Sequence, residues 1–144
     1  MIITICASMT LASRIREVQQ QLKALGHTVY VPVEVEEFDY QQATTEERAE
    51  LKRNFDLIRE HWRKIQKSDA ILVLNETVKG IEYYIGGNSF LEMGFAHILD
   101  LPIFLMQPVP AMPYASEMAA MDATILDGDL SRIPQATAPV ETRG

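Results

Sequence analysis

The sequence predicts an α/β domain with a doubly wound, mostly parallel sheet of about five strands. Short, nearly all-apolar segments rich in β-branched residues recur along the chain, as in strands that are buried on both faces. Between them lie segments whose apolar residues are spaced by three and four, which is the spacing of one helix face. The resulting order is β-α-β-α-β-α-β-β, and strand–helix–strand units pair in parallel with a right-handed crossover.

The first such unit spans residues 2–32. Residues 2–7 (IITICA) and 27–32 (HTVYVP) predict strands. The helix between them has one apolar face, and Gly26 is a suitable residue to end it. That apolar face consists of Leu11, Ile15, Val18, Leu22 and Leu25.

The middle of the chain contains a loop, a long helix and the clearest buried strand. Residues 33–44 are acidic and irregular, which is typical of a surface loop. Thr44 and Glu47 have the spacing of a capping box and predict the start of a helix that continues to about Lys67. Residues 70–74 (AILVL) predict the strand. The apolar face of the helix is Leu51, Phe55, Ile58, Trp62 and Ile65.

The elements predicted for the rest of the chain are shorter. In order, they are a loop at 75–87, a helix at 89–99, a strand at 102–106, a loop at 107–112, a helical turn at 116–121 and a strand at 123–126. Residues 1–133 therefore predict a single domain, and residues 134–144 predict a flexible tail.

The composition limits the class of protein and its partners. The apolar fraction of 47% and the charged fraction of 23% are ordinary for a globular protein. No apolar run approaches the roughly 18 residues of a membrane span, and the N-terminus lacks the basic region of a signal peptide. We therefore expect a cytoplasmic protein with no membrane partner. The net charge of −7 disfavours a nucleic-acid polymer, which requires a basic face, but is compatible with a small nucleotide.

The strongest functional signal is the segment 85–96 (IGGNSFLEMGFA). Gly86 and Gly87 let the backbone approach a ligand closely, and a helix start offers free N–H groups. Glu92 is predicted in the first helical turn at the carboxyl edge of the sheet, where its carboxylate could attack a sugar C1. Alternatively, Ser89 and Glu92 form a capping box, which requires no catalysis. The two interpretations do not exclude each other.

Two other segments leave the same edge of the sheet. Ser8 and Thr10 could bind a phosphate or a sugar hydroxyl, or could only cap the following helix, which we favour. Cys6, the single cysteine, excludes an intrachain disulfide and is predicted to be a small buried hydrophobic residue. Asn75 ends the central strand, where ligands commonly bind in this architecture, although it could simply begin a turn.

The three histidines lack the spacing of metal ligands, and we predict no metal site. His61, beside Trp62 at the edge of an apolar stripe, could face a pocket or be solvated. His97 follows Glu92 by five residues and therefore points away from it, which favours packing or an oligomer contact. His27 is predicted to lie on the surface.

Together these residues resemble the nucleoside 2-deoxyribosyltransferase family. The resemblance rests on residues 68–74 (SDAILVL), a loop, residues 92–96 (EMGFA) at a helix start, and 102–103 (PI) in the next strand. Residues 6–8 (CAS) also resemble the phosphate loop of the related 2′-deoxynucleoside 5′-phosphate N-hydrolases. Over residues 1–106 the chain looks like a divergent member. The resemblance implies a flavodoxin-like, Rossmann-like fold and N-glycosidic cleavage by a glutamate nucleophile, without a cofactor.

The resemblance also implies roles for individual residues. Glu92 matches the nucleophile and Ser8 the phosphate-contacting serine, while His61 falls near a base-contacting aspartate and could protonate the leaving base. Where the family usually has a sugar-contacting aspartate or serine this chain has Gly86, and Asn88 is the nearest polar substitute. The substrate-binding candidates are Ser8, Asn75, Gly86, Gly87, Asn88 and Ser89.

Two alternatives to this activity stay open. A non-catalytic nucleotide-binding or sensor domain would keep the pocket without the chemistry, and the missing sugar-contacting acid favours it. Residues 86–92 (GGNSFLE) also resemble the P-G-G-x-G-T-x-x-E motif of lysine-decarboxylase-like phosphoribohydrolases, with the glutamate one residue out of register. The expected partner is in each case a small nucleoside or nucleotide.

We also expect a homodimer or a higher even homo-oligomer, because related small domains usually complete their pockets with a neighbouring subunit. The loop 107–114 and a helix face with Phe90, Met93 and His97 carry more apolar and aromatic residues than one short sheet is expected to cover. The alternative is a monomer that buries these residues in its own core.

Overall fold

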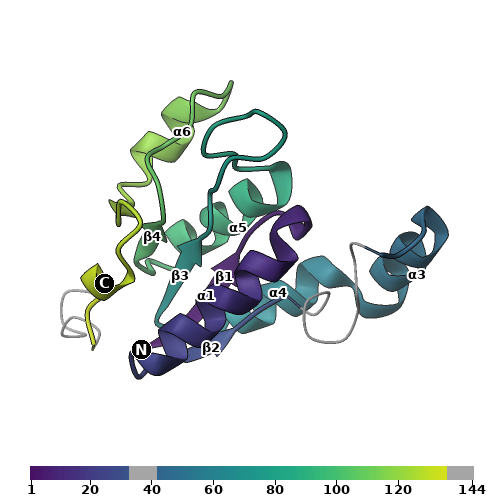
Figure 1. The fold of residues 1–144 in the computed structure, drawn as a ribbon, viewed down its shortest axis with the longest axis horizontal. Coiled ribbons are helices and arrows are strands. Elements are labelled where there is room, and N and C mark those ends of the chain that lie inside the picture. The colour runs from purple at the N-terminus through teal and green to yellow at the C-terminus, as the bar shows by residue number, and fades with distance from the viewer. Residues whose placement is uncertain (33–41, 136–144) are drawn as a thin grey trace.

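Five parallel strands form one sheet in the computed structural model, which describes residues 1–32 and 42–135 (Figure 1). The strands are β1 (Ile2–Cys6), β2 (Thr28–Tyr30), β3 (Ala70–Val73), β4 (Ile103–Leu105) and β5 (Thr124–Ile125). Their order, β2-β1-β3-β4-β5, is that of flavodoxin-like folds, with the reversal of strand order between β1 and β3. The predicted parallel, doubly wound α/β sheet is confirmed.

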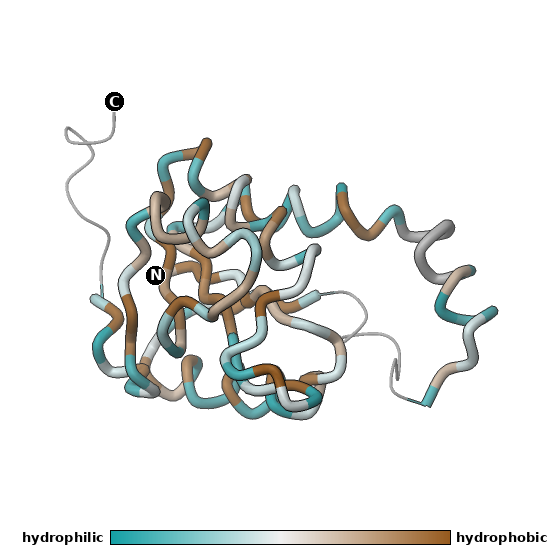
Figure 2. The backbone as a smooth tube through the Cα atoms, turned by 90° about the horizontal axis from the view of Figure 1, so that it is seen from above, coloured by the Kyte–Doolittle hydropathy of each residue, from teal (hydrophilic) through white to brown (hydrophobic). Residues whose placement is uncertain are grey.

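Helices cover both faces of this sheet (Figure 1). They are the short 3₁₀ helix η1 (Met9–Leu11), α1 (Ala12–Ala24), α3 (Thr45–Phe55), α4 (Leu57–Gln66), α5 (Gly87–Ile98), α6 (Ala115–Ala120) and the 3₁₀ helix η2 (Leu130–Arg132). One apolar core lies between the sheet and α1, and a second lies between the sheet and α4, α5 and α6. Apolar residues accordingly concentrate along the central segments in Figure 2.

Alternate residues of each strand supply the two cores, because successive side chains of a strand point to opposite faces. In β1, Ile3 and Ile5 pack on the side of α1, whereas Cys6 packs on the side of α4 and α5. Thr4 is also fully buried, and its Oγ1 lies 2.6 Å from the Oγ of Ser68, which satisfies the hydroxyl. The last residue of β1 therefore faces the helices that carry His61 and Glu92.

The first predicted helix ends as expected. Gly26 has a φ of 96°, which is favourable for glycine. Its N–H donates to the carbonyl of Lys23, and the N–H of His27 donates to the carbonyl of Leu22. These two bonds form a Schellman motif, which turns the chain from α1 directly into β2.

The long helix predicted from Thr44 to Lys67 is wrong as one element. The capping box of Thr44 and Glu47 is present, but the helix divides into α3 and α4 at Asp56, whose φ is 43°. Aspartate tolerates this left-handed conformation better than most residues, because its short polar side chain bonds locally. As a result α3 projects away from the sheet in both views (Figures 1 and 2).

Two predictions of exposure are also wrong. His27 is only 5% exposed, because its ring packs beside the N-terminus, with Nδ1 3.1 Å from the amino group of Met1. Met93 is fully buried in the core of its own chain, and Phe90 stacks on Tyr114 with ring centroids 4.5 Å apart. The helix face proposed as an interface is therefore largely covered within the chain, and the homo-oligomer stays a prediction.

The tail predicted for residues 134–144 lies, from residue 136 onward, outside the described residues, as does most of the predicted loop at 33–44. Among the helices of the described ranges, none has both the length and the apolar character required to cross a membrane.

Candidate active site

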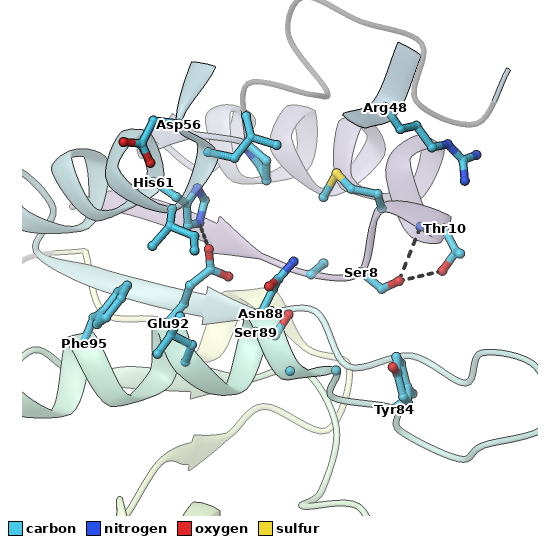
Figure 3. A pocket seen from close by; sticks show the side chains of 18 residues that line it. Ser8, Thr10, Arg48, Asp56, His61, Tyr84, Asn88, Ser89, Glu92 and Phe95 are labelled. Atoms are coloured by element: carbon cyan, nitrogen blue, oxygen red, sulfur yellow. Dashed lines mark hydrogen bonds and ion pairs between the residues drawn. The ribbon is translucent and has the colours of Figure 1, made fainter. Parts of the chain in front are cut away.

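A cavity of about 520 Å³ opens at the carboxyl ends of β1 and β3, where the strand order reverses (Figure 3). Four parts of the chain line it: residues 7–10 after β1, Pro32 after β2, residues of α3 and α4 around their junction, and the segment from Tyr84 into α5. Ligands of open α/β sheets bind at this position. Seven of the residues predicted for the site line the cavity. They are Ser8, His61, Gly86, Gly87, Asn88, Ser89 and Glu92.

Glu92 and His61 face each other across one end of the cavity (Figure 3). Glu92 comes from the second turn of α5, and its Oε2 lies 3.2 Å from Nε2 of His61 on α4. The side chain of Glu92 is 15% exposed and that of His61 is 6% exposed. The carboxylate is therefore mostly buried but still lines the cavity. A carboxylate with one restrained oxygen at the cavity surface is suited to nucleophilic or acid–base chemistry.

Cys6 completes a group of three side chains at this end. It is fully buried, as predicted, but it is more than an apolar filler, because its Sγ lies 3.4 Å from Nε2 of His61. Burial raises the pKa of the Cys6 thiol well above its usual range, and the nearby Glu92 carboxylate raises it further. The thiol is therefore protonated at neutral pH.

The imidazole of His61 is neutral at the same pH. Burial, and to a lesser extent the positive charge of Lys64 on the same helix, lower the pKa of His61 to about 4. The ring can therefore donate a single N–H, and donation from Nε2 to Glu92 would orient the carboxylate. With this pKa the ring almost never carries a second proton near pH 7, so the geometry favours His61 as a positioning residue over the acid suggested above.

The start of α5 differs from the predicted capping box. Gly86 is the N-cap and the helix begins at Gly87, so Ser89 lies inside the first turn and is 3% exposed. Glu92 is then one turn too far along the helix to complete a box with Ser89, and that interpretation is wrong. Glu92 bonds to His61 instead, which removes the main structural explanation for a carboxylate at this position.

Close packing explains the glycine at position 86. A Cβ added to Gly86 would lie 2.9 Å from the hydroxyl of Tyr84, which also lines the cavity. Tyr84 therefore packs directly over the start of α5, next to the N–H groups that a first helical turn leaves without intrahelical partners. Any larger residue at Gly86 would displace this ring.

The other end of the cavity carries hydroxyl groups and one cation. Ser8 caps η1 by accepting a bond from the N–H of Thr10 at 3.4 Å, and the two hydroxyls lie 2.9 Å apart. The favoured capping role is thus present, and both residues still line the cavity. Arg48 of α3 lies at the same end, apart from Glu92 (Figure 3). No local pattern along the chain marks Arg48 as a site residue, because only the fold brings α3 over this end.

Asn75 does not line the cavity, and the substrate role predicted for it has no support in the structure. Its side chain is fully buried and donates to the carbonyls of Gln107 and Pro108 at 2.9 and 3.0 Å. It also accepts from the N–H of Gln107 at 2.9 Å. These bonds tie the end of β3 to the end of β4, which is a structural role.

Comparisons with known proteins give similarity of fold. The sequence matches no protein-family profile and no curated protein. The 2-deoxyribosyltransferase from the bacterium Bacillus psychrosaccharolyticus has a similar structure, with 19% identity and a TM-score of 0.48 over 73% of this chain and 71% of that chain. A CMP N-glycosidase of Clostridium botulinum is similar at 12% identity and a TM-score of 0.49, over 87% of this chain and 85% of that one. Similarity at this level does not assign an activity to this chain.

Proposed function

We propose that the chain cleaves the N-glycosidic bond of a nucleoside or nucleoside monophosphate, by transfer or by hydrolysis, with Glu92 as the nucleophile. The observation that carries the proposal is the Glu92 carboxylate at the wall of the cavity, with Nε2 of His61 at 3.2 Å. The sequence resemblance to nucleoside 2-deoxyribosyltransferases supports the same assignment. A volume of about 520 Å³ is within the range of cavities that enclose small organic ligands.

The proposed reaction has two steps. A carboxylate oxygen of Glu92 bonds to C1′ of the sugar while the bond from C1′ to the base nitrogen breaks, and its electron pair leaves with the base. Water or an acceptor base then attacks C1′ and releases the carboxylate. The neutral N–H of His61 would hold Glu92 in the orientation that the first step requires.

The polar end of the cavity supports a monophosphate as one substrate. The hydroxyls of Ser8 and Thr10 and the guanidinium of Arg48 are groups that bind phosphate oxygens well. Asn88 lies between this end and Glu92 in Figure 3, where a sugar hydroxyl would be placed. The two ends thus match the two ends of a nucleotide sugar.

The second candidate function is nucleotide binding without chemistry. The glycine at position 86, in place of a sugar-contacting acid, favours it. Both candidates use the same cavity, so binding alone does not separate them, whereas release of a free base does.

The test is base release from a panel of nucleosides and nucleoside monophosphates, measured by chromatography for the wild type and for Glu92→Gln. We expect the variant to lose at least about two orders of magnitude in rate, because an amide is a poor nucleophile. Glutamine keeps an oxygen that can accept from His61, so the fold should persist. Glu117→Gln on α6, an exposed position outside the cavity, is the matched control. Base release by Glu92→Gln at the wild-type rate would refute the nucleophile, and no release by any form would favour the binding module.

A further inference from the structure

Three different metal-ligand atoms lie close together at the end of the cavity that carries Glu92. Sγ of Cys6, an imidazole nitrogen of His61 and a carboxylate oxygen of Glu92 all lie within 4.8 Å of one another. The three residues come from β1, α4 and α5, so the meeting of their side chains is a product of the fold and not of local sequence. Cys6 and His61 are buried and Glu92 is nearly so.

Two of the three distances within this group are close to those around a tetrahedral ion. Nε2 of His61 lies 3.2 Å from Oε2 of Glu92 and 3.4 Å from Sγ of Cys6. At typical zinc bond lengths of about 2.0–2.3 Å, the ligand atoms of a tetrahedral site are roughly 3.4–3.6 Å apart. The third distance, between Sγ of Cys6 and the carboxylate oxygen of Glu92, is no more than 4.8 Å, so side-chain adjustments would admit an ion among the three atoms.

Hydrogen bonds already link these side chains, because the Cys6 thiol bonds to Glu92 and Nε2 of His61 lies within bonding distance of both. One imidazole nitrogen faces both the thiol and the carboxylate, and it carries at most one proton. It can therefore donate to one of these neighbours at a time. A metal ion would bind the nitrogen, the sulfur and the oxygen together.

We propose that Cys6, His61 and Glu92 form a binding site for a divalent ion of the zinc class. A set of one sulfur, one nitrogen and one oxygen ligand suits zinc, whereas magnesium and calcium prefer oxygen ligands alone. Binding replaces the thiol proton of Cys6, which is released to solvent, and the thiolate and carboxylate then balance the charge of the ion. Since Glu92 lines the cavity, the fourth position of the ion faces the space where a substrate would lie.

The site goes beyond the proposed glycosidic activity and excludes it while it is occupied. A carboxylate oxygen that ligates a metal is less able to attack C1′, because its electron pair is shared with the ion. A zinc-loaded chain should therefore release base more slowly than the same chain in the presence of a chelator. The ion and the substrate would compete for one carboxylate.

The experiment measures metal binding without substrate, so that its result does not depend on the proposed activity. Purified full-length chain is stripped with a chelator and titrated with cobalt(II), a spectroscopic substitute for zinc. We expect one ion per chain, a thiolate-to-cobalt charge-transfer band in the near ultraviolet, and loss of the band when zinc is added. No band and no bound zinc in equilibrium dialysis would overturn the proposal.

Variants assign the ligands. Cys6→Ser should abolish the charge-transfer band, and His61→Gln and Glu92→Gln should each weaken binding by more than the roughly 10- to 100-fold lost when an outer-shell partner is removed. His97→Gln, at an exposed position farther along α5, is the matched control and should bind as the wild type does. Circular dichroism checks folding, and Cys6→Ala serves if the serine variant does not fold. Wild-type affinity in a folded Cys6 variant would overturn the site, whereas absent base release in chelator would count only against the proposed activity.

Discussion

Acidification should destabilise this protein through His61. Its ring is 5% exposed and burial lowers its pKa to about 4 from an ordinary value of 6.5. The unfolded chain therefore takes up this proton at a higher pH than the folded chain does. The contribution of neutral, buried His61 to the free energy of unfolding is fully present above about pH 6.5 and is lost as the pH falls toward about 4. The difference in pKa, at about 1.4 kcal/mol for each pH unit, corresponds to about 3 kcal/mol.

Charged and titratable groups near His61 also affect the direction of its pKa shift. Lys64 on the same helix opposes protonation, whereas the Glu92 carboxylate favours it. Cys6 is a neutral thiol and contributes little charge. Burial is the largest of these effects, and the pKa of His61 is therefore lowered overall.

Urea unfolding from pH 7 to pH 4 at constant ionic strength measures this effect. The comparison is with His61→Gln, which keeps an N–H donor for Glu92 but does not titrate. The wild type should lose about 3 kcal/mol more than the variant across this range. An equal loss in both proteins, or a smaller loss in the wild type, would refute the reasoning. The second result would mean that folded His61 is charged and forms an ion pair with Glu92.

Two further predictions concern the ends of the strands. Ser8→Ala should raise the KM for a nucleoside monophosphate and leave the KM for the matching nucleoside unchanged, as expected for loss of a ground-state phosphate contact. Steady-state kinetics on both substrates measures this difference. Equal effects on the two substrates would contradict the phosphate role of Ser8. Asn75→Ala should lower the free energy of unfolding by roughly 2 kcal/mol, because it leaves partly buried backbone groups of Gln107 and Pro108 without their partner. Urea unfolding measures the loss, and an unchanged midpoint would contradict the structural role given to Asn75.

The sequence was sufficient for the sheet, because its signals are local. A run such as residues 70–74, apolar at every position, predicts a strand buried on both faces, and the structure has β3 there. The glycine at position 26 likewise predicts the end of α1. These features depend on neighbours along the chain, which are visible in one sequence.

The errors arose where tertiary contacts override a local pattern. Ser89 and Glu92 have capping-box spacing, but the helix starts at Gly87 and Glu92 instead meets His61. Asn75 has the position of a ligand-binding residue, and its substrate role stays a prediction, but its amide bonds to backbone groups after β4. Asp56 interrupts a helix whose apolar spacing continues through it. None of these partners could be identified from spacing alone.

The alternation of side chains along β1 determines which of its residues reach the site. Thr4 and Cys6 point to the face covered by α4 and α5, and the register pairs Cys6 with Val73 at the carboxyl end of β3. A shift of one residue would replace the Cys6 thiol near His61 with an apolar or small side chain. The thiol is therefore held against the candidate nucleophile by the same register that builds the core. Because both proposals require the carboxylate of Glu92, substrate and metal should compete for it, and each assay must be run with the metal content of the protein known.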